Sequence, residues 1–347
     1  MQAKLILADG TEYEGTSFGY AFSHSGEVVF ATGMTGYPQA FTDPSFAGQI
    51  LVMTYPLIGN YGVPGEELWE SDKLQISGLI VSDYIDTPSH FQSKMTLAKW
   101  LKKSKIPGLV IKDTRALTQK LRSNGVMLGK IVIDKDIPQY DPNKTNLVAK
   151  VSTKKVIKGG QGNKTIVIID CGAKRNIAKC FINRGVKTIT VPWDYDPFKN
   201  NLQFDALFIS NGPGDPKMAD KTIETIKIAL DKKVPTLGIC LGNQLLALAA
   251  GGDTYKLKYG HRSQNQPCLL NNSTRCYITT QNHGFAIKTV PPGFNPWFIN
   301  ANDQTIEGII HKKYPFMSVQ FHPEANPGPK DTEWIFDYFL ERINYEK

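Results

Sequence analysis

The sequence predicts an α/β protein, in which a C-terminal domain with a mostly parallel sheet flanked by helices follows a smaller α+β domain. Residues 165–170 (TIVIID) and 234–240 (VPTLGIC) are continuous apolar runs, typical of strands that are buried on both faces. Helical patterns alternate with such runs, which indicates right-handed crossovers and a mostly parallel sheet. Residues 156–164 (VIKGGQGNK) are glycine-rich and polar. We therefore expect domains at 1–155 and 165–347, joined by a linker at 156–164.

The first domain is predicted to consist mainly of strands with two helices. Asp9-Gly10 lies between short extended runs and indicates a hairpin. Strands are expected at 27–33 (EVVFATG) and from 49 (QILVMTYPLIGNYG). Residues 89–105 are predicted to be helical, because Phe91, Met95, Ala98 and Leu101 fall on one face. A second helix is expected at 113–125, beginning with a capping aspartate and ending at a glycine.

The second domain alternates predicted strands with predicted helices. Helices are expected at 173–185, 221–232 and 241–252, with a final helix at 331–344. The further predicted strands are VKTITV (186–191), DALFIS (205–210), CYITT (276–280), FAIKT (285–289), TIEGII (305–310) and FMSVQF (316–321).

Composition excludes several classes of protein. The 347 residues are 41% hydrophobic and 21% charged, as in an ordinary globular protein. No apolar run approaches the roughly 18 residues that span a bilayer, and the first residues lack a secretory pattern, so we expect a cytoplasmic protein. The net charge of +8 comes from scattered lysines in short clusters, which favours a solvated basic face over nucleic-acid binding. Five cysteines without a CxxC pair indicate neither a disulfide framework nor a common zinc site.

Cys240 is the candidate nucleophile. It ends a buried strand and begins a helix, and Gly238-x-Cys240-x-Gly242 has the layout of a nucleophile elbow with cysteine in place of serine. The turn lifts the side chain out of the carboxyl edge of the sheet, where ligands bind in such folds. The helix N-terminus favours a thiolate and offers backbone N–H groups to an oxyanion. The alternative is an inert cysteine in a buried strand.

His322 and Glu324 are the candidate partners of this thiol. His322 ends the strand FMSVQF, Pro323 stiffens the turn, and Glu324 can hold the imidazole in one tautomer. The alternative is a strand-end histidine beside a surface glutamate. Residues 210–216 (SNGPGDP) follow another strand of the sheet. They form either a plain turn or a loop whose backbone N–H groups hold a bound carbonyl.

The motifs SNGPGDP, GICLGNQLLALAAGG and QFHPEANPGP, in this order, resemble the class I (triad) glutamine amidotransferases. The first half adds TGMTGYPQAFTDPSFAGQILVMTYPLIGNYG and KDTRALTQKLRSNG, which with CGAKRNIAKC resemble the small, glutamine-hydrolysing subunit of carbamoyl phosphate synthetase. The resemblance runs nearly from end to end. It implies a heteromer with a large synthetase subunit that binds ATP and metal, no cofactor or metal in this chain, and a role in pyrimidine or arginine biosynthesis.

The resemblance also implies the reaction and its site. L-Glutamine is hydrolysed to glutamate and ammonia through a Cys240 thioester, with His322 as acid and base and Glu324 as its orienting group. The Leu241 N–H and a glycine N–H of the 212–214 loop hold the oxyanion. The family's glutamine contacts fall on Ser45, Gly212, Gly214, Leu241, Gln244, Asn282, Gly284 and Phe285. The alternatives are a turn residue at Ser45 and a solvent-facing helix residue at Gln244.

Two positions depart from the family pattern. Asn243 stands where the family usually has histidine, which puts the support of Cys240 in doubt, and Cys171 replaces a more usual aromatic residue. Three other functions compete with this interpretation. They are an anthranilate- or guanylate-type amidotransferase, a free-standing hydrolase of γ-glutamyl bonds, and an inactive scaffold. The long first domain argues against the first, and the intact set Cys240, His322 and Glu324 argues against the last.

Overall fold

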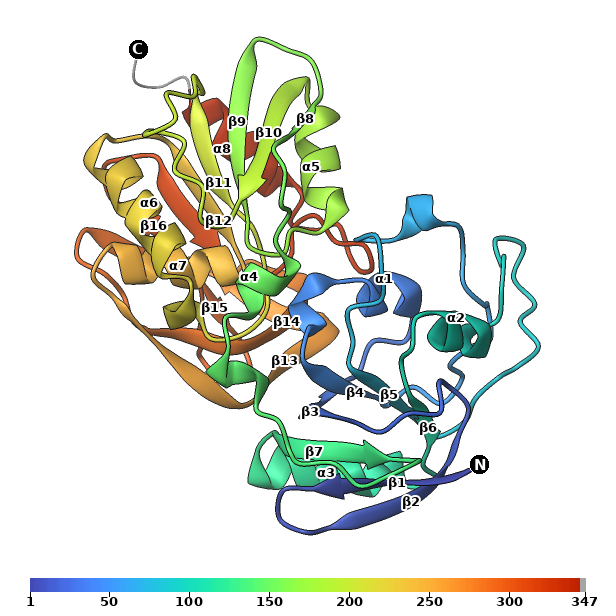
Figure 1. Ribbon diagram of the computed structural model, residues 1–347. Coiled ribbons are helices and arrows are strands. Elements are labelled where there is room, and N and C mark those ends of the chain that lie inside the picture. The colour runs from blue at the N-terminus through green and yellow to red at the C-terminus, as the bar shows by residue number, and fades with distance from the viewer. Residues whose placement is uncertain (344–347) are drawn as a thin grey trace. The chain divides into compact units, whose positions relative to one another are not determined.

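The computed structural model describes residues 1–343 and divides into two compact units, Met1–Thr145 and Asn146–Lys347 (Figure 1). The predicted linker at 156–164 lies inside the second unit. Its residues Ile157–Gly159 form strand β8, which pairs antiparallel with β10 (Val186–Pro192). The glycines that resemble a linker serve close packing instead, since a Cβ on Gly160 or Gly162 would meet the backbone of residues 185 and 186.

The first unit is a closed barrel with the strand order β1-β2-β6-β5-β4-β3-β7. Four neighbouring strands, β3 to β6, run parallel, and the remaining pairs are antiparallel. The strands are β1 (Gln2–Leu7), β2 (Glu12–Ser17), β3 (His24–Ala31), β4 (Gln49–Met53), β5 (Gly78–Val81), β6 (Gly108–Val110) and β7 (Met127–Val132). The expected α+β character of this unit is therefore observed, and the predicted hairpin at Asp9-Gly10 joins β1 to β2.

Three helices pack on the barrel strands: α1 (Tyr37–Phe41), α2 (Leu97–Lys103) and α3 (Thr114–Asn124). Helix α3 begins after Asp113, whose side chain accepts a hydrogen bond from Ala116 N at 2.8 Å, as predicted. Helix α2 is shorter than predicted, because Thr96 caps it and the chain before Thr96 is not helical. Phe91, assigned to the apolar face of that helix, is 88% exposed.

The second unit contains a ten-stranded sheet with the order β14-β13-β15-β16-β17-β12-β11-β9-β10-β8. Five strands form a parallel centre: β10, β9 (Lys164–Asp170), β11 (Ala206–Ile209), β12 (Thr236–Ile239) and β17 (Phe316–Val319). The expected fold class is confirmed by this sheet. Because β11, β12 and β17 are neighbours that run in one direction, the loops that follow them meet at one edge.

Helices cover both faces of this sheet (Figure 1). Alternate residues of β9 enter two cores, with Ile166 and Ile168 on one side and Val167 and Ile169 on the other. The first core includes side chains of α5 (Arg175–Ile182) and α8 (Trp334–Arg342), and the second those of α6 (Asp220–Asp231) and α7 (Leu241–Ala249). The unit begins with the short helix α4 (Leu147–Val151). This two-sided burial explains the continuous apolar runs.

The antiparallel side of the sheet is longer than predicted. It contains β13 (Asp253–Leu270), β14 (Cys276–Thr289), β15 (Phe294–Asn300) and β16 (Ile306–His311). The two predicted strands at 276–280 and 285–289 are parts of the single strand β14, and β13 and β15 were not predicted. Across residues 1–343, the structure has no helix with the length and apolar character needed to cross a membrane.

Candidate active site

Cys240 lies in a strained turn between β12 and α7. Its backbone has φ 56° and ψ −103°, a region that residues other than glycine rarely adopt. The turn is held in place because Cys240 N donates to the carbonyl of Val319, the last residue of β17, at 2.8 Å. The Cys240 thiol donates to Asn282 O at 3.6 Å on strand β14. The cysteine therefore occupies a strand-to-helix elbow, not a position within a strand.

The glycines around Cys240 allow the helix and the strands to approach closely. A Cβ on Gly238 would lie 2.4 Å from Gly242 O, and a Cβ on Gly242 would lie 2.2 Å from Ile209 O. Neither separation is compatible with a side chain unless the backbone moves. The GxCxG spacing is thus a packing requirement of the elbow.

His322 and Glu324 follow the end of β17, the parallel neighbour of β12. His322 Nδ1 and Glu324 Oε1 are 2.7 Å apart, and the two residues are 1% and 3% exposed. Because a carboxylate only accepts, Nδ1–H donates, and Nε2 is the ring nitrogen left for proton transfer. Nε2 has no hydrogen-bond partner among residues 1–343. The burial of Glu324 excludes the surface-glutamate alternative.

Lys174 joins this pair, and the sequence interpretation missed it. Its Nζ lies 3.2 Å from Glu324 Oε1 and donates to Ala325 O, and the residue is 3% exposed. The turn before it is fixed because Asp170 Oδ1 accepts hydrogen bonds from Gly172 N and Ala173 N. The available signal was its position: Lys174 follows the end of β9, at the same edge of the sheet as Cys240.

The buried charges shift the pKa values of the pair in opposite directions. Burial alone lowers the pKa of His322, but the charges of Glu324 and Cys240 outweigh it and raise that pKa to about 10. Burial raises the pKa of Glu324, but Lys174 and His322 outweigh it and lower that pKa to about 2. Glu324 is therefore a carboxylate, and His322 is a base strong enough to take the proton of the Cys240 thiol.

The loop after β11 packs against the elbow where Gly212 approaches Leu241, the first residue of α7. A Cβ on Gly212 would be 2.1 Å from Cys171 O and 2.8 Å from Leu241 Cδ2. Gly214 has φ +84°, which turns the loop back toward Leu147. The first N–H groups of α7, beginning at Leu241, have no intrahelical acceptor. The loop and the helix N-terminus are thus adjacent, as an oxyanion site requires.

The other predicted glutamine contacts of the second unit lie on α7 and β14. Gln244 Nε2 donates to Phe285 O at 2.8 Å, and the residue is 2% exposed, which excludes a solvent-facing role. Asn282 and Phe285 are thereby tied to Cys240 and Gln244 through their main-chain carbonyl groups, and Gly284 lies between them in β14. Ser45 belongs to the first unit, where it lies in the short 3-10 helix Pro44–Phe46 and is 5% exposed. Its contribution to a glutamine pocket stays a prediction.

Asn243 is part of a buried chain of amides behind the elbow. Its Oδ1 accepts from Ser318 Oγ at 2.8 Å, and its Nδ2 donates to Gln320 Oε1 at 3.0 Å. Gln320 Oε1 also accepts from Gln244 Nε2 at 3.1 Å. Asn243 therefore connects α7 to β17 and, through Gln320, to Gln244. We infer that it supports the site indirectly.

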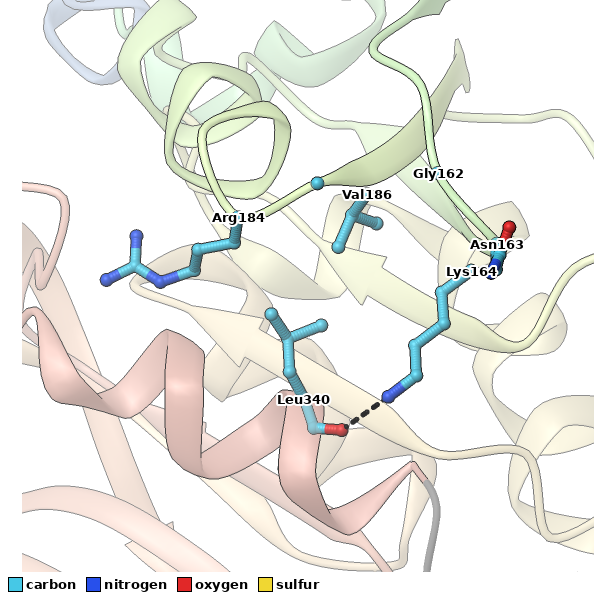
Figure 2. Close-up of a pocket in the computed structure, with 7 residues that line it drawn as sticks. Gly162, Asn163, Lys164, Arg184, Val186 and Leu340 are labelled. Carbon is cyan, nitrogen blue, oxygen red and sulfur yellow. Dashed lines mark hydrogen bonds between the residues drawn. The ribbon is translucent and has the colours of Figure 1, made fainter.

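A separate pocket lies at the opposite end of β9 (Figure 2). It is lined by Gly162, Asn163, Lys164, Arg184, Gly185, Val186 and Leu340. Lys164 Nζ donates to Leu340 O at 3.0 Å, and Arg184 is paired with Asp337 at 2.7 Å. None of the predicted catalytic or glutamine-binding residues lines this pocket. Its two cationic side chains, Lys164 and Arg184, already contact other groups of the protein.

Comparison with known proteins agrees with this geometry. Residues 167–342, just over half of the chain, match the model of the glutamine amidotransferase class-I family. The chain therefore belongs to the class-I glutamine amidotransferases. Residues 5–131 match the CPSase domain of the carbamoyl-phosphate synthase small chain.

Three relatives match nearly the whole chain. Multifunctional protein CAD of Squalus acanthias is 48% identical over 98% of this chain. Multifunctional protein URA2 of Saccharomyces cerevisiae is 46% identical over 98%, and the human mitochondrial carbamoyl-phosphate synthase [ammonia] is 45% identical over 99%. The chain spans 16%, 17% and 24% of the lengths of these three relatives, respectively. The relatives are thus much larger proteins that contain a segment similar to this chain.

Proposed function

We propose that this chain hydrolyses L-glutamine to glutamate and ammonia, with Cys240 as nucleophile and His322 and Glu324 completing the triad. The observation that carries the proposal is the position of Cys240. It lies in a strained elbow beside a buried histidine and carboxylate that follow the neighbouring strand. Strain of this kind costs on the order of 1–3 kcal/mol and is concentrated at functional sites.

The chemistry proceeds in two halves. Cys240 Sγ attacks the side-chain amide carbon of glutamine, and the thiol proton passes to His322 Nε2. The C–N bond then breaks as His322 returns that proton to the departing ammonia, which leaves a glutamyl thioester. His322 next removes a proton from water, which attacks the thioester and releases glutamate and the thiol. Leu241 N–H and the Gly212–Gly214 loop stabilise the oxyanion in both halves.

The proposed consumer of the ammonia is a carbamoyl phosphate synthetase, carried on a large partner subunit or on another part of the same polypeptide. Free ammonia in neutral water is mostly protonated and no longer nucleophilic, so a protected route to the synthetase gives the hydrolysis its use. ATP and metal belong to the synthetase in this proposal, and this chain supplies no cofactor to the glutaminase reaction. Carbamoyl phosphate would serve pyrimidine or arginine biosynthesis. The cytoplasm remains the proposed location, which cell fractionation tests.

One relative favours a second candidate function. The name of the human protein specifies ammonia, and a synthetase that takes free ammonia has no need of glutamine hydrolysis. In that case the segment would bind to the synthetase without turning over glutamine. The triad Cys240, His322 and Glu324 argues for hydrolysis, because a purely binding segment needs none of these side chains in this arrangement.

The deciding experiment measures glutamate release by the purified chain with and without the synthetase, ATP and bicarbonate. We expect slow hydrolysis by the chain alone and a large increase with the synthetase and its substrates, because the partner shifts the pocket toward its competent form. Cys276→Ser is the matched control, since Cys276 is an exposed free cysteine. Activity that is full in isolation and unchanged by the synthetase would favour a free-standing hydrolase. No glutamate release under any condition would favour the ammonia-type function.

A further inference from the structure

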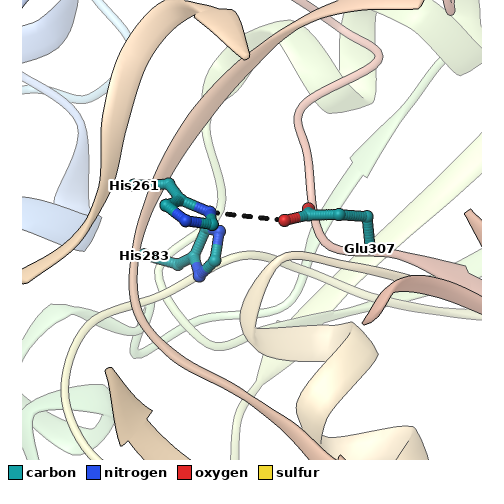
Figure 3. Close-up of side chains that lie close together, drawn as sticks. All are labelled: His261, His283 and Glu307. Atoms are coloured by element: carbon teal, nitrogen blue, oxygen red, sulfur yellow. Dashed lines mark ion pairs between the residues drawn. The ribbon is translucent and has the colours of Figure 1, made fainter. Parts of the chain in front are cut away.

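A second cluster of titratable side chains lies on the antiparallel side of the sheet. His261 on β13, His283 on β14 and Glu307 on β16 place one ligand atom each within 4.8 Å of one another (Figure 3). The three residues are 7%, 5% and 0% exposed. The side-chain oxygen of Gln281, a residue that is 2% exposed, also faces both histidines. None of these side chains has a role in the proposed triad.

In each histidine, the outer ring nitrogen, which points away from the cluster, already donates a hydrogen bond. His261 Nε2 is 2.9 Å from Asp303 Oδ2, and His283 Nδ1 is 2.8 Å from Phe285 O. Carboxylate and carbonyl oxygens only accept, so both outer nitrogens carry the proton. This leaves His261 Nδ1 and His283 Nε2 as the inward-facing atoms. A carboxylate or a backbone carbonyl on the outer nitrogen is the usual arrangement around metal-bound histidines.

The inward-facing ring nitrogens and the Gln281 oxygen are acceptors that converge with no donor between them, whereas Glu307 Oε1 already accepts from Thr305 Oγ1 at 3.1 Å and from Asn300 Nδ2 at 3.3 Å. Gln281 Oε1 lies 2.9 Å from His261 Nδ1 and 3.0 Å from His283 Nε2, and Glu307 Oε1 lies 3.3 Å from His261 Nδ1. Reversing the Gln281 amide does not resolve this arrangement. Its Nε2 donates to Glu307 Oε2 at 3.0 Å, and the reversal would place an oxygen against that carboxylate.

Protons on the two histidine rings also leave the cluster unsatisfied. A proton on His261 Nδ1 would donate to Gln281 or Glu307, but His283 Nε2 would still face the amide oxygen. Protons on both rings would bury two cations whose ring centroids are 4.9 Å apart. A single divalent cation at the centre would satisfy both ring nitrogens and the Gln281 oxygen at once, with Glu307 Oε1 as its fourth contact. It would also balance the charges of Glu307 and Asp303.

We propose that His261 Nδ1, His283 Nε2, Glu307 Oε1 and Gln281 Oε1 form a structural Zn²⁺ site. Ligands at about 2.0–2.1 Å in a tetrahedron are roughly 3.3 Å apart, close to the separations of 2.9, 3.0 and 3.3 Å in three of the six ligand pairs. Two imidazoles with oxygen ligands suit zinc better than the hard cations. Four protein ligands in a buried position leave no open coordination site, which is typical of a structural metal.

The site would fix the strand that borders the proposed active site. Gln281 and His283 flank Asn282, whose carbonyl accepts the hydrogen bond from the Cys240 thiol. Phe285 O accepts from both His283 Nδ1 and Gln244 Nε2. Zinc would therefore hold β13, β14 and β16 together behind this segment. Binding of the metal itself does not depend on the proposed glutaminase activity.

The test measures the metal content and thermal unfolding of the full chain. We expect about one zinc per chain by elemental mass spectrometry after dialysis against metal-free buffer. Removal by a strong chelator should lower the Tm, and added Zn²⁺ should restore it. Glu307→Gln should lose stoichiometric zinc. Asp303→Asn keeps all four ligands and should weaken the affinity by about 10- to 100-fold. His311→Asn alters a histidine outside the cluster and should retain the metal.

Cobalt substitution separates this site from capture by a cysteine. Co²⁺ at the proposed ligands should give tetrahedral d–d bands without a thiolate charge-transfer band, and Cys276→Ser should leave the spectrum unchanged. The proposal is overturned if the wild-type chain holds no zinc and its Tm does not respond to added Zn²⁺. It is equally overturned if Glu307→Gln and Asp303→Asn bind zinc as tightly as the wild type.

Discussion

Gly242→Ala tests whether close packing of the elbow controls the reaction. Gly242 is the second residue of α7, directly behind Cys240. A Cβ at this position would lie 2.2 Å from Ile209 O, 2.9 Å from Ile209 C and 3.1 Å from Ile209 Cβ. The obstacle is the backbone of β11 and not the end of a flexible side chain. The start of α7 must therefore move away from the sheet.

The size of the effect follows from this separation. Cβ contacts below 3.0 Å essentially do not occur, so widening 2.2 Å to 3.0 Å moves the helix start by about 0.8 Å. A misplacement of about 1 Å in a reacting group costs on the order of 100-fold in rate. Inserting one methyl group into a packed core costs about 1–3 kcal/mol of unfolding free energy. We expect kcat for glutamate release to fall about 100-fold while the chain still folds.

The assay pairs steady-state glutamate release with denaturant unfolding. Gly159→Ala is the matched control. A Cβ on Gly159 would meet only the side-chain atoms Ile182 Cδ1 and Thr188 Oγ1, both at 3.2 Å, and not the backbone of another strand. The control lies on β8 and should leave kcat unchanged. If Gly242→Ala retained both the wild-type kcat and the wild-type unfolding free energy, the packing argument for the elbow would be refuted.

Further predictions concern the triad and its supports. His322→Asn should reduce acylation by orders of magnitude and Glu324→Gln by less, measured by rapid quench; equal, negligible losses would reject the triad. Glu324→Gln removes the carboxylate beside buried Lys174 and should lower the unfolding free energy, measured by denaturant unfolding, by about 3–5 kcal/mol. An unchanged unfolding free energy would show that the ion pair does not stabilise the fold. Asn243→His should change kcat modestly, whereas a collapse to the level of Cys240→Ser would place Asn243 in the core machinery. The raised pKa of His322 gives stability that is complete below pH 6.5 and is lost toward about pH 10. The lowered pKa of Glu324 gives stability that is lost below pH 4.5 toward about pH 2. The difference in Tm between wild type and His322→Asn should therefore shrink as pH rises above 6.5, and a constant difference would contradict this coupling.

The parallel centre of the second unit could be predicted because its sequence signals arise from residues that are neighbours in the chain. Strands buried on both faces give continuous apolar runs, and the GxCxG spacing marks a tight elbow independently of distant contacts. Both signals led to Cys240. The neighbouring positions of β12 and β17, which bring His322 to the cysteine, required the assembled sheet.

The antiparallel strands could not be predicted for a physical reason. Residues 261–266 of β13 are HRSQNQ, a polar stretch that is typical of a loop. His261 is nevertheless buried, because its ring lies against Gln281, Asp303 and Glu307 from other parts of the chain. Lys174 was missed in the same way, since a lysine is buried only when a distant partner such as Glu324 compensates its charge. Periodicity does not detect partners of this kind.

The most direct test of the central claim is whether glutamine forms a thioester on Cys240. The purified chain is mixed with L-glutamine, quenched in acid and examined by intact-protein and peptide mass spectrometry. A glutamyl adduct should appear on the peptide that contains Cys240 and should be absent in Cys240→Ser. Cys276→Ser should leave it unchanged. The adduct should form before glutamate is released. Glutamate release without any adduct on Cys240, or equal release by Cys240→Ser, would contradict the proposed mechanism.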